Sequence, residues 1–469
     1  MRRVLALALL TQAACWTEDS FRQKCLDTGR CTMTPELGGG VGGGGATGGG
    51  GAATGGGGAA TGGGGDATGG GGDATGGGGG ATGGGGGATM GGGGGATMGG
   101  GGGTTGGGTG GGFVSDGGEL TWNEVAAELF PSTQLDAGFT VTFRPHGIQN
   151  AMWAGGVLTS TGDVICIPYN GGQALRISRD RVSIGTYNIG PNGPWEGGVL
   201  LADGRVLGIP YEYPGFIAIS STDGVVLDAG LPRLNASVIP YFEGGVLTLS
   251  QKVLLAPSRH FFPGVYDPAT QELTIYDAGT PSSVRSDTYY AGAILLADGE
   301  SAIVVPRSST RMIHLTPSQA SFTGPPNMNG HAGGLLLPDG RVLMIPTLGG
   351  ADFVVWDPAN PSVVTSGQTP RDGFFSAAWS TNGYAYAMQT DGPTANLTII
   401  AIDQNGTLVS ETIMDGGIGQ NSHYGLVSME DGVLVGCPYN PGRDVMFITP
   451  SDRRTVSLRA MTSPWLNKW

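Results

Sequence analysis

Two glutamates at matching positions of a repeated motif are the residues best suited to chemistry in this sequence. Glu196 and Glu243 each stand directly before a Gly-Gly pair, at 197–198 and 244–245. Two carboxylates about 5 to 9 Å apart can act as acid and base in the cleavage of a glycosidic bond. A solvated polar rim would carry the same residue types, and the sequence leaves both interpretations open.

Further polar residues follow the second apolar run of the motif. Tyrosines stand there at Tyr169, Tyr211 and Tyr439, and charged or imidazole side chains stand there at Glu212, Arg259, His260, Arg307 and Asp391. With the two glutamates, these charged side chains predict a ligand-binding sector over the second to fourth copies, formed by Glu196, Glu212, Glu243, Arg259, His260 and Arg307.

An aromatic or imidazole ring lies two residues before the start of every copy. The seven rings are Trp153, Trp195, Phe242, Tyr290, His331, Phe374 and His423. They could form a collar on which sugar rings or another flat ligand stack. They could equally pack between repeats, and a ring present in every repeat favours that structural role. Side chains alternate along a strand, so rings that pointed to a ligand would leave the glutamates one residue on pointing elsewhere.

The motif that positions these residues is clearest at Gly197–Pro210, where two apolar runs flank Asp203-Gly204. Asp-Gly is typical of a type I′ turn, so each copy predicts a tight β-hairpin. The third copy, with Ser250–Lys252 at the turn, lacks this signal.

Seven copies of the motif predict an all-β, seven-bladed β-propeller over residues 139–469. Successive copies are separated by 41 residues (292 to 333) at the least and 49 residues (376 to 425) at the most, which suits four-stranded blades. Small residues are expected where innermost strands converge on an axis, and they begin the copies at Gly155, Gly197, Gly244, Gly292, Gly333, Ser376 and Gly425.

Two segments compete to supply the strand that closes the propeller. Phe139–Phe143 alternates as a strand does, and Thr455–Leu458 also resembles an outer strand. We expect the first of these to complete the last blade. The lead-in at 114–138 is predicted to hold a short helix on the outside of the domain, because Thr121 and Glu124 have the spacing of a capping box.

The N-terminus is typical of an exported protein. Arg2-Arg3, the apolar run 4–10 and Ala13-Ala14-Cys15 predict a signal peptide over 1–14 that is too short to span a bilayer. Ala-Ala-Cys resembles the end of a bacterial lipobox, so Cys15 is the predicted lipidation site, with ordinary signal cleavage as the alternative. In the short segment 15–37, Cys25 and Cys31 predict a disulfide, as expected in an oxidising compartment.

The remaining cysteines and the glycine content complete the domain organisation. Much of the chain's 94 Gly lies in 38–113, which predicts a disordered linker. Cys166 and Cys437 lie on the second strands of the first and last copies, one residue apart in register. Their side chains should therefore point to opposite faces, which predicts two buried free thiols.

The repeats resemble kelch-type propellers, including the central domain of galactose oxidase. The resemblance rests on the Gly-Gly pairs, the Asp-Gly hairpins, and third strands that end in Tyr266-Asp267-Pro268 or Trp356-Asp357-Pro358. The signal and the low-complexity linker are similar to those of bacterial surface lipoproteins that carry such propellers. The Tyr, His and Cys ligands of the copper site of galactose oxidase have no counterpart here, so that activity and its cofactor are not implied.

Composition narrows the functions further. No phosphate-binding loop, calcium loop or His/Cys metal spacing is present, so we expect no metal and no cofactor. A net charge of -14 disfavours nucleic acid, and membrane contact is expected only through a lipid on Cys15. The sequence predicts a monomeric binding module for an extracellular carbohydrate or protein, located on the outer membrane or cell surface or else secreted. The alternative is an extracellular glycan hydrolase or lyase.

Overall fold

The structure is a computed structural model that describes residues 118–133, 135–190, 193–211, 215–224, 242–258, 262–276, 278, 290–347, 352–362, 364–367, 373–389, 397–414 and 422–466. The predicted signal peptide, the linker, Cys15, Cys25, Cys31, Glu212, Arg259 and His260 lie outside these ranges. Within them, no helix combines the length and apolar character that a membrane span requires.

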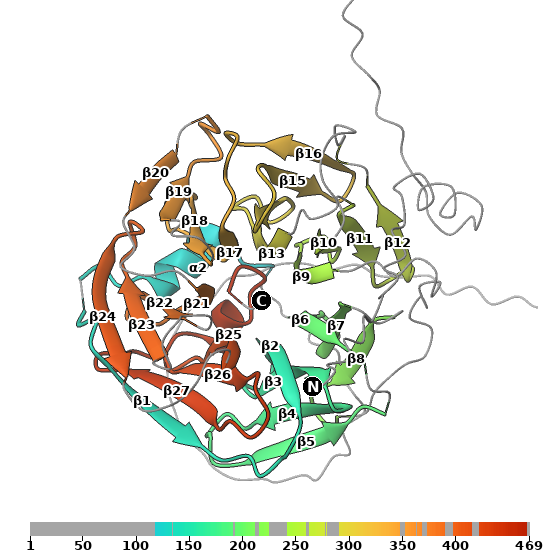
Figure 1. The fold of residues 1–469 in the computed structure, drawn as a ribbon, viewed down its shortest axis with the longest axis vertical. Helices are drawn as coiled ribbons and strands as arrows, with labels where there is room; N and C mark the ends of the chain where they lie inside the picture. Colours follow the sequence, from blue (N-terminus) through green and yellow to red (C-terminus); the bar gives the residue numbers. More distant parts are fainter. Residues whose placement is uncertain are drawn as a thin grey trace, which may run out of the picture. The chain divides into compact units, whose positions relative to one another are not determined.

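The strands of the described residues form seven antiparallel sheets around a common axis, which confirms the seven-bladed β-propeller (Figure 1). We number the blades in chain order. Blade 1 holds β2 (Met152–Leu158), β3 (Val164–Asn170), β4 (Gln173–Ile177) and β5 (Ile184–Asn188); blade 2 holds β6 (Trp195–Leu200), β7 (Arg205–Pro210) and β8 (Ile217–Ser220); blade 3 holds β9 (Phe242–Leu247), β10 (Val253–Pro257), β11 (Gly264–Asp267) and β12 (Glu272–Ile275).

Blades 4 to 7 repeat this order from the axis outward. Blade 4 holds β13 (Tyr290–Leu295), β14 (Ala302–Pro306), β15 (Met312–Thr316) and β16 (Gln319–Thr323); blade 5 holds β17 (His331–Leu336), β18 (Val342–Pro346), β19 (Phe353–Trp356) and β20 (Val364–Gly367); blade 6 holds β21 (Phe374–Trp379), β22 (Ala385–Gln389), β23 (Leu397–Ile402) and β24 (Leu408–Met414); blade 7 holds β25 (His423–Ser428), β26 (Leu434–Pro438), β27 (Val445–Pro450) and β1 (Phe139–Arg144).

Strand β1 closes the propeller, as predicted. It runs antiparallel to β27 with Val141 opposite Ile448. The outermost strand of blade 7 is therefore supplied by the segment that precedes blade 1 in the sequence. The competing prediction for Thr455–Leu458 is wrong. The chain there has no strand and leads into the short helix α3 (Leu458–Met461), whose N-cap Ser457 accepts from the Ala460 amide.

Blades 1 and 7 are joined by a disulfide between Cys166 on β3 and Cys437 on β26, with Cα atoms 5.8 Å apart. The prediction of two free thiols is therefore wrong. The register argument did place the thiols on opposite faces of their blades. In a ring of stacked blades, however, the front of one blade meets the back of the next, so cysteines on opposite faces of neighbouring blades point toward each other.

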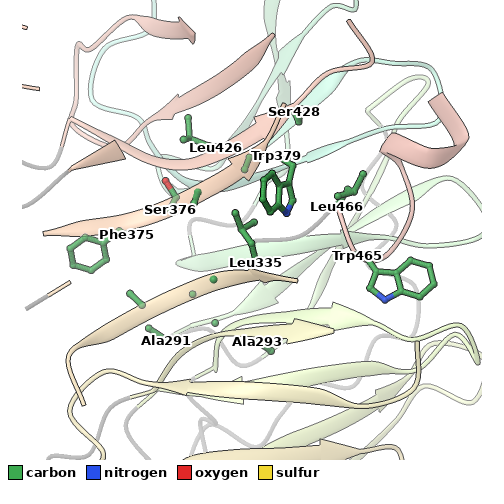
Figure 2. A pocket seen from close by; sticks show the side chains of 16 residues that line it. Ala291, Ala293, Leu335, Phe375, Ser376, Trp379, Leu426, Ser428, Trp465 and Leu466 are labelled. Atoms are coloured by element: carbon green, nitrogen blue, oxygen red, sulfur yellow. The ribbon is translucent and has the colours of Figure 1, made fainter. Parts of the chain in front are cut away.

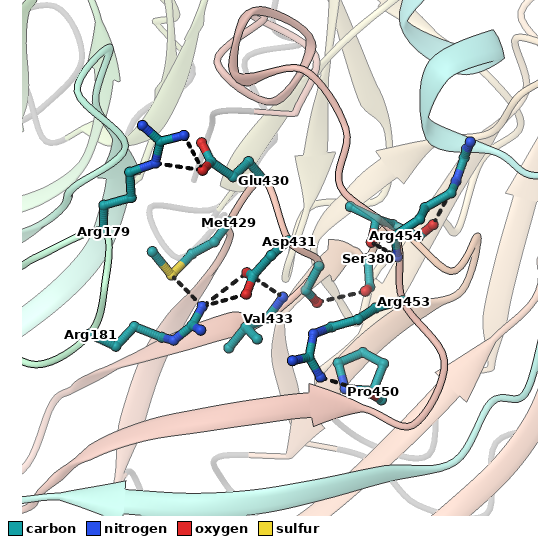
Figure 3. Close-up of polar contacts among 12 residues, drawn as sticks. Arg179, Arg181, Ser380, Met429, Glu430, Asp431, Val433, Pro450, Arg453 and Arg454 are labelled. Atoms are coloured by element: carbon teal, nitrogen blue, oxygen red, sulfur yellow. Dashed lines mark hydrogen bonds and ion pairs between the residues drawn. The ribbon is translucent and has the colours of Figure 1, made fainter.

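Ion pairs hold the same seam together at the blade edges (Figure 3). Arg181, in the β4–β5 turn of blade 1, contacts Asp431 in the β25–β26 turn of blade 7 at 2.8 Å, and Arg179 pairs with Glu430 beside it. The seam between the first and last blades is thus cross-linked covalently near the axis and by charge further out.

The hairpin turns differ in type from the prediction. Only Gly204 of the Asp203-Gly204 pair has a positive φ, 83°, and the Leu201 amide donates to the Arg205 carbonyl at 2.8 Å. This pattern fits a three-residue loop, in which a type I turn is followed by one left-handed residue, rather than a type I′ turn.

The third copy makes the same turn without glycine. Gln251 takes the left-handed position with φ 63°, and the Thr248 amide donates to the Lys252 carbonyl at 2.8 Å. The lost sequence signal therefore did not remove the hairpin of blade 3.

A β-bulge lies at the start of each innermost strand. In blade 2, Trp195 pairs with Pro210 but the next regular pair is Gly198 with Gly208, so one strand carries an extra residue. The first glycine of the pair supplies the backbone conformation that the bulge needs, since Gly197 has φ 71°. At the second position of the motif in blade 5 a side chain would collide with the neighbouring strand: a Cβ on Gly334 would lie 2.2 Å from the Leu343 carbonyl oxygen.

The helix α2 (Trp122–Leu129) packs at the ends of the innermost strands, on the face of the hairpin turns. Its capping box is confirmed: the Thr121 side chain accepts from the Glu124 amide while the Glu124 carboxylate accepts from the Thr121 amide. Trp122 is buried and donates from Nε1 to the Leu337 carbonyl at 3.2 Å, just past the end of β17.

The C-terminal tail covers the same end of the axis. Trp465 donates from Nε1 to the Leu296 carbonyl at 2.8 Å, and with Leu466 and Trp379 it lines one end of a cavity of about 40 Å³ between the innermost strands (Figure 2). Phe375 lines the cavity toward its other end. This volume holds water but not a sugar ring.

Candidate functional site

We use the term mouth for the face of the propeller where the innermost strands begin and the second strands end. The candidate residues that the sequence suggested at the edges of the central motif, where the structure describes them, belong to this face. The two positions that precede each motif, however, have different surroundings there.

The seven rings of the predicted collar are all buried, with at most 3% of their surface exposed. Four of them form hydrogen bonds of 2.8 to 3.0 Å with main-chain oxygens at the start of the third strand of their own blade: Trp153 with Gln173, Trp195 with Gly215, His331 with Asp352, and His423 with Asp444. Such contacts direct the rings outward into the blades. The rings therefore have no exposed surface on which a ligand could stack, as expected if they pack inside the propeller.

The residues one position further on face the axis instead. Ala154, Ala291, Ala332, Phe375 and Tyr424 come from blades 1, 4, 5, 6 and 7, yet they form one buried cluster. Ala291, Ala332 and Phe375 also line the cavity between the innermost strands, which places this position at the axis. Glu196 and Glu243 occupy this same position in blades 2 and 3 and are 5% and 2% exposed.

Glu243 is oriented by two polar neighbours. Its carboxylate accepts a hydrogen bond from Ser258 Oγ at 3.0 Å, and Arg307 Nη1 of blade 4 approaches it at 3.5 Å. The guanidinium of Arg307 also lies over the Phe375 ring, 4.8 Å from its centroid. The cation of the site is therefore held between a carboxylate and an aromatic face.

Aromatic rings continue around the mouth from that point. Phe375 contacts Tyr424 with centroids 5.3 Å apart, Tyr424 contacts Tyr439 at 5.1 Å, Tyr439 contacts Tyr169 at 5.2 Å, and Tyr169 contacts Tyr211 at 5.9 Å. We call these five residues the aromatic row. Tyr169, Tyr211 and Tyr439 follow second strands and are partly exposed, whereas Phe375 and Tyr424 are buried beneath them.

The charges of Glu196 and Glu243 affect the pKa values of tyrosines in the aromatic row. Burial, followed by the charges of Glu196 and Glu243, raises the pKa of Tyr424 well above its usual 10. Burial and then Glu196 raise the pKa of Tyr439 to about 12. Both phenols thus stay protonated at neutral pH and can donate hydrogen bonds.

The pKa of Arg307 is also affected by these carboxylates. Burial works to lower this pKa, but the negative charges of the mouth, Glu243 first, outweigh burial and raise it. The charge of Glu196 raises the pKa of Arg307 as well, so both carboxylates act on this guanidinium.

The sequence grouped Glu196, Glu243 and Arg307 in one sector, and in the structure Arg307 contacts Glu243 while Glu196 holds the same position in blade 2 as Glu243 in blade 3. Sequence reasoning did not select Phe375 and Tyr424. Their signal was available, since both occupy the position of the two glutamates, one residue before the anchors Ser376 and Gly425. The sequence also shows the tyrosines of the rim, Tyr169, Tyr211 and Tyr439, but the predicted ligand-binding sector did not include them.

Among the described residues, the mouth supplies hydrogen-bond acceptors, phenol donors, aromatic faces and the guanidinium of Arg307. Within the described residues, no cluster of three or more His, Cys, Asp or Glu side chains is arranged to hold a metal ion. The arrangement suits recognition of a polar ligand with flat or cationic faces. Its two carboxylates on adjacent innermost strands also supply the pair of groups that acid–base chemistry needs.

Comparisons with known proteins identify the fold. No family model matches the chain, and no curated protein matches it in sequence. The virginiamycin B lyase from Staphylococcus aureus superposes with a TM-score of 0.55 at 13% identity, over 66% of this chain and 99% of that one.

Two further solved structures superpose similarly. A streptogramin B lyase structure gives a TM-score of 0.56 at 12% identity, over 67% of this chain and 98% of that one. A catalytically inactive variant of the Staphylococcus aureus virginiamycin B lyase with quinupristin gives 0.54 at 12% identity, over 66% and 99%. At such identities the likeness shows a shared propeller fold and carries no activity to this chain.

Proposed function

We propose that this protein is an exported, surface-tethered propeller of the kelch-like type that binds an extracellular carbohydrate or protein at its mouth. The observation that carries the proposal is the aromatic row beside two buried carboxylates, a combination of groups that is typical of binding sites, where polar side chains converge among aromatic ones. Partly exposed tyrosines beside polar groups are typical of recognition sites.

The location at the cell surface rests on the N-terminal sequence. The signal peptide 1–14, lipidation of Cys15 and the glycine-rich linker 38–113 would place the propeller outside the cell at the end of a tether. The disulfide between Cys166 and Cys437 supports export, since structural disulfides persist in oxidising compartments.

A second function, cleavage of an extracellular glycan, is favoured by one specific observation. Glu196 and Glu243 lie on neighbouring innermost strands, β6 and β9, and both act on the pKa of Tyr424 and of Arg307. Two carboxylates on neighbouring strands could serve as acid and base.

The proposal is tested by titrating the full chain with a panel of polysaccharide fragments and extracellular proteins in calorimetry. We expect a saturable signal that weakens about tenfold in Tyr169→Ala, which corresponds to about 1.4 kcal/mol of binding free energy. Tyr187→Ala is the matched control, because Tyr187 is also partly exposed but lies on the outer strand β5. A ligand whose affinity is equal in both variants would place binding elsewhere.

Glu196→Gln separates the two functions. A binding module keeps its ligand unchanged in chemical structure with or without this substitution. An enzyme converts the ligand in the original chain, and the variant binds but fails to turn it over. Glu272→Gln, an exposed glutamate on the outer strand β12, is the control for loss of charge.

A further inference from the structure

The cavity between the innermost strands is a second place where the fold can hold a ligand. Its described lining comes from blades 4 to 7 and from the C-terminal tail, whose Trp465 and Leu466 line one end (Figure 2). Trp465 is only 2% exposed, so the tail separates this end of the cavity from solvent. The described lining carries no charged side chain, which favours a neutral polar ligand over an ion.

Two serine hydroxyls in the lining have no partner in the protein. Ser376 on β21 and Ser428 on β25 are 5% and 6% exposed. Within the described residues, neither Oγ atom makes a hydrogen bond. A buried hydroxyl without a partner costs free energy, and such groups in folded proteins are generally satisfied by the protein or by ordered water.

The backbone does not require serine at position 376. The other six copies of the motif begin with glycines whose φ lies between 64 and 93°, whereas Ser376 does not have a positive φ. Ser376 instead pairs with Met388 in the ladder of blade 6. Alanine would fit the same backbone, so the hydroxyl calls for a partner in the cavity beside it.

The bulges add main-chain groups to the same wall. Regular pairing of the innermost strands in blades 4 and 5 skips four residues of the lining: Ala291, Gly292, Ala332 and Gly333. A Cβ on Gly333 would lie 3.9 Å from the carbonyl oxygen of Phe375, which the ladder of blade 6 also skips. Main-chain N–H and C=O groups outside a ladder need other partners when they are buried.

We propose that the cavity beside blades 4 to 7 binds a small cluster of ordered water molecules as a permanent part of the structure. The Ser376 and Ser428 hydroxyls and the main-chain groups at the bulges are the hydrogen-bond partners of this cluster. A cavity of about 40 Å³ holds roughly three water molecules, because each needs about 10 to 15 Å³ of such volume. The inference does not depend on the function proposed for the mouth.

Melting temperatures test whether the two hydroxyls are hydrated. If water satisfies them, Ser376→Ala and Ser428→Ala each remove a hydrogen bond and should lower the melting temperature of the full chain by about 1 to 2 °C. Thr398→Val is the matched control. Thr398 Oγ1 on β23 is also buried and also lacks a partner within the described residues, but Thr398 is not in the described lining of the cavity, so this change should not lower the melting temperature.

Oxygen-17 relaxation of the solvent detects water molecules that stay inside a protein in solution. The full chain is compared with the double variant Ser376→Val/Ser428→Val, which removes both hydroxyls and fills part of the space. We expect the contribution of long-lived water to fall by about two molecules per chain. If the double variant does not fold, the alanine variants decide alone.

Two results would overturn the inference. Unchanged solvent relaxation in a folded double valine variant would show that no long-lived water is bound beside these serines. A higher melting temperature in both alanine variants would show that the hydroxyls are unsatisfied in a dry cavity, because removal of an unpaired buried hydroxyl stabilises a protein. Neither result would affect the binding function proposed for the mouth.

Discussion

The disulfide between Cys166 and Cys437 should be a main support of the closed ring. Its two ends are 271 residues apart, so it closes a loop that includes nearly the whole propeller. The chain-entropy relation for a loop of this size gives between about 5 and 6 kcal/mol, and measured values are commonly about 2 to 4 kcal/mol. We therefore expect removal of the bridge to lower the free energy of unfolding by about 3 to 5 kcal/mol.

The loss converts into a measurable melting shift. For a propeller spanning 118–466, the unfolding entropy is about 0.7 kcal/mol/K, so the double variant Cys166→Ala/Cys437→Ala should melt about 4 to 7 °C lower. Differential scanning calorimetry measures the shift. Peptide mapping without reductant should first show Cys166 linked to Cys437 in the original chain.

Reductant separates the bridge from the packing of the two sulfur atoms. Both cysteines are fully buried, so alanine also removes core volume. The original chain, unfolded and refolded with its thiols reduced, should lose most of the same stability, whereas the double variant should not respond to reductant. The reasoning is refuted if oxidised and reduced original chains melt at the same temperature.

Three further outcomes follow from the fold. The pKa of His423 is lowered to about 4, first by burial. The stability that comes from keeping this imidazole neutral is therefore complete above pH 6.5 and is lost as the pH falls toward 4. His423→Phe should flatten this part of a profile of melting temperature against pH. Gly334→Ala should cost more than about 2 kcal/mol in urea unfolding because of the clash with the next strand, while Gly185→Ala, with open space around it, should change stability by less than about 0.5 kcal/mol. Thr121→Ala removes the cap of α2 and should lower the free energy of unfolding by about 1 kcal/mol, measured the same way; an unchanged value would show that the helix is held by Trp122 alone.

The architecture was predictable from sequence because a propeller repeats its local signals. Each blade carries its own glycine pair and hairpin, so one clear copy at Gly197–Pro210 identified weaker ones. The closing strand β1 was predicted for a related reason: Phe139–Phe143 alternates strictly, as the outermost strand of a blade does. The turn of blade 3 shows the limit of such signals, since Gln251 adopts the left-handed conformation that its residue type does not announce.

Contacts between blades were harder to predict. Register within a strand states which face of a blade a residue occupies, but not which face of the neighbouring blade it meets. Cys166 and Cys437 were assigned to opposite faces, and in a ring that assignment brings them together. The C-terminal segment misled for a similar reason, because Val456 and Trp465 are buried against the end of the axis rather than along a blade edge.

The site itself depends on the bulge at each anchor glycine. Because side chains alternate along a strand, the sequence predicted that the ring before each motif and the residue that follows it point in different directions. It did not predict which of the two faces the axis. The extra residue between Trp195 and Gly198 breaks the regular ladder at that point, and Trp195 turns back to bond Gly215 within its own blade. Position 196 is then left at the inner edge, where no further strand covers it. In blade 2 the first glycine of the pair thus does more than relieve crowding at the axis: Gly197, with φ 71°, accommodates the bulge that leaves Glu196, and not the indole of Trp195, at the mouth.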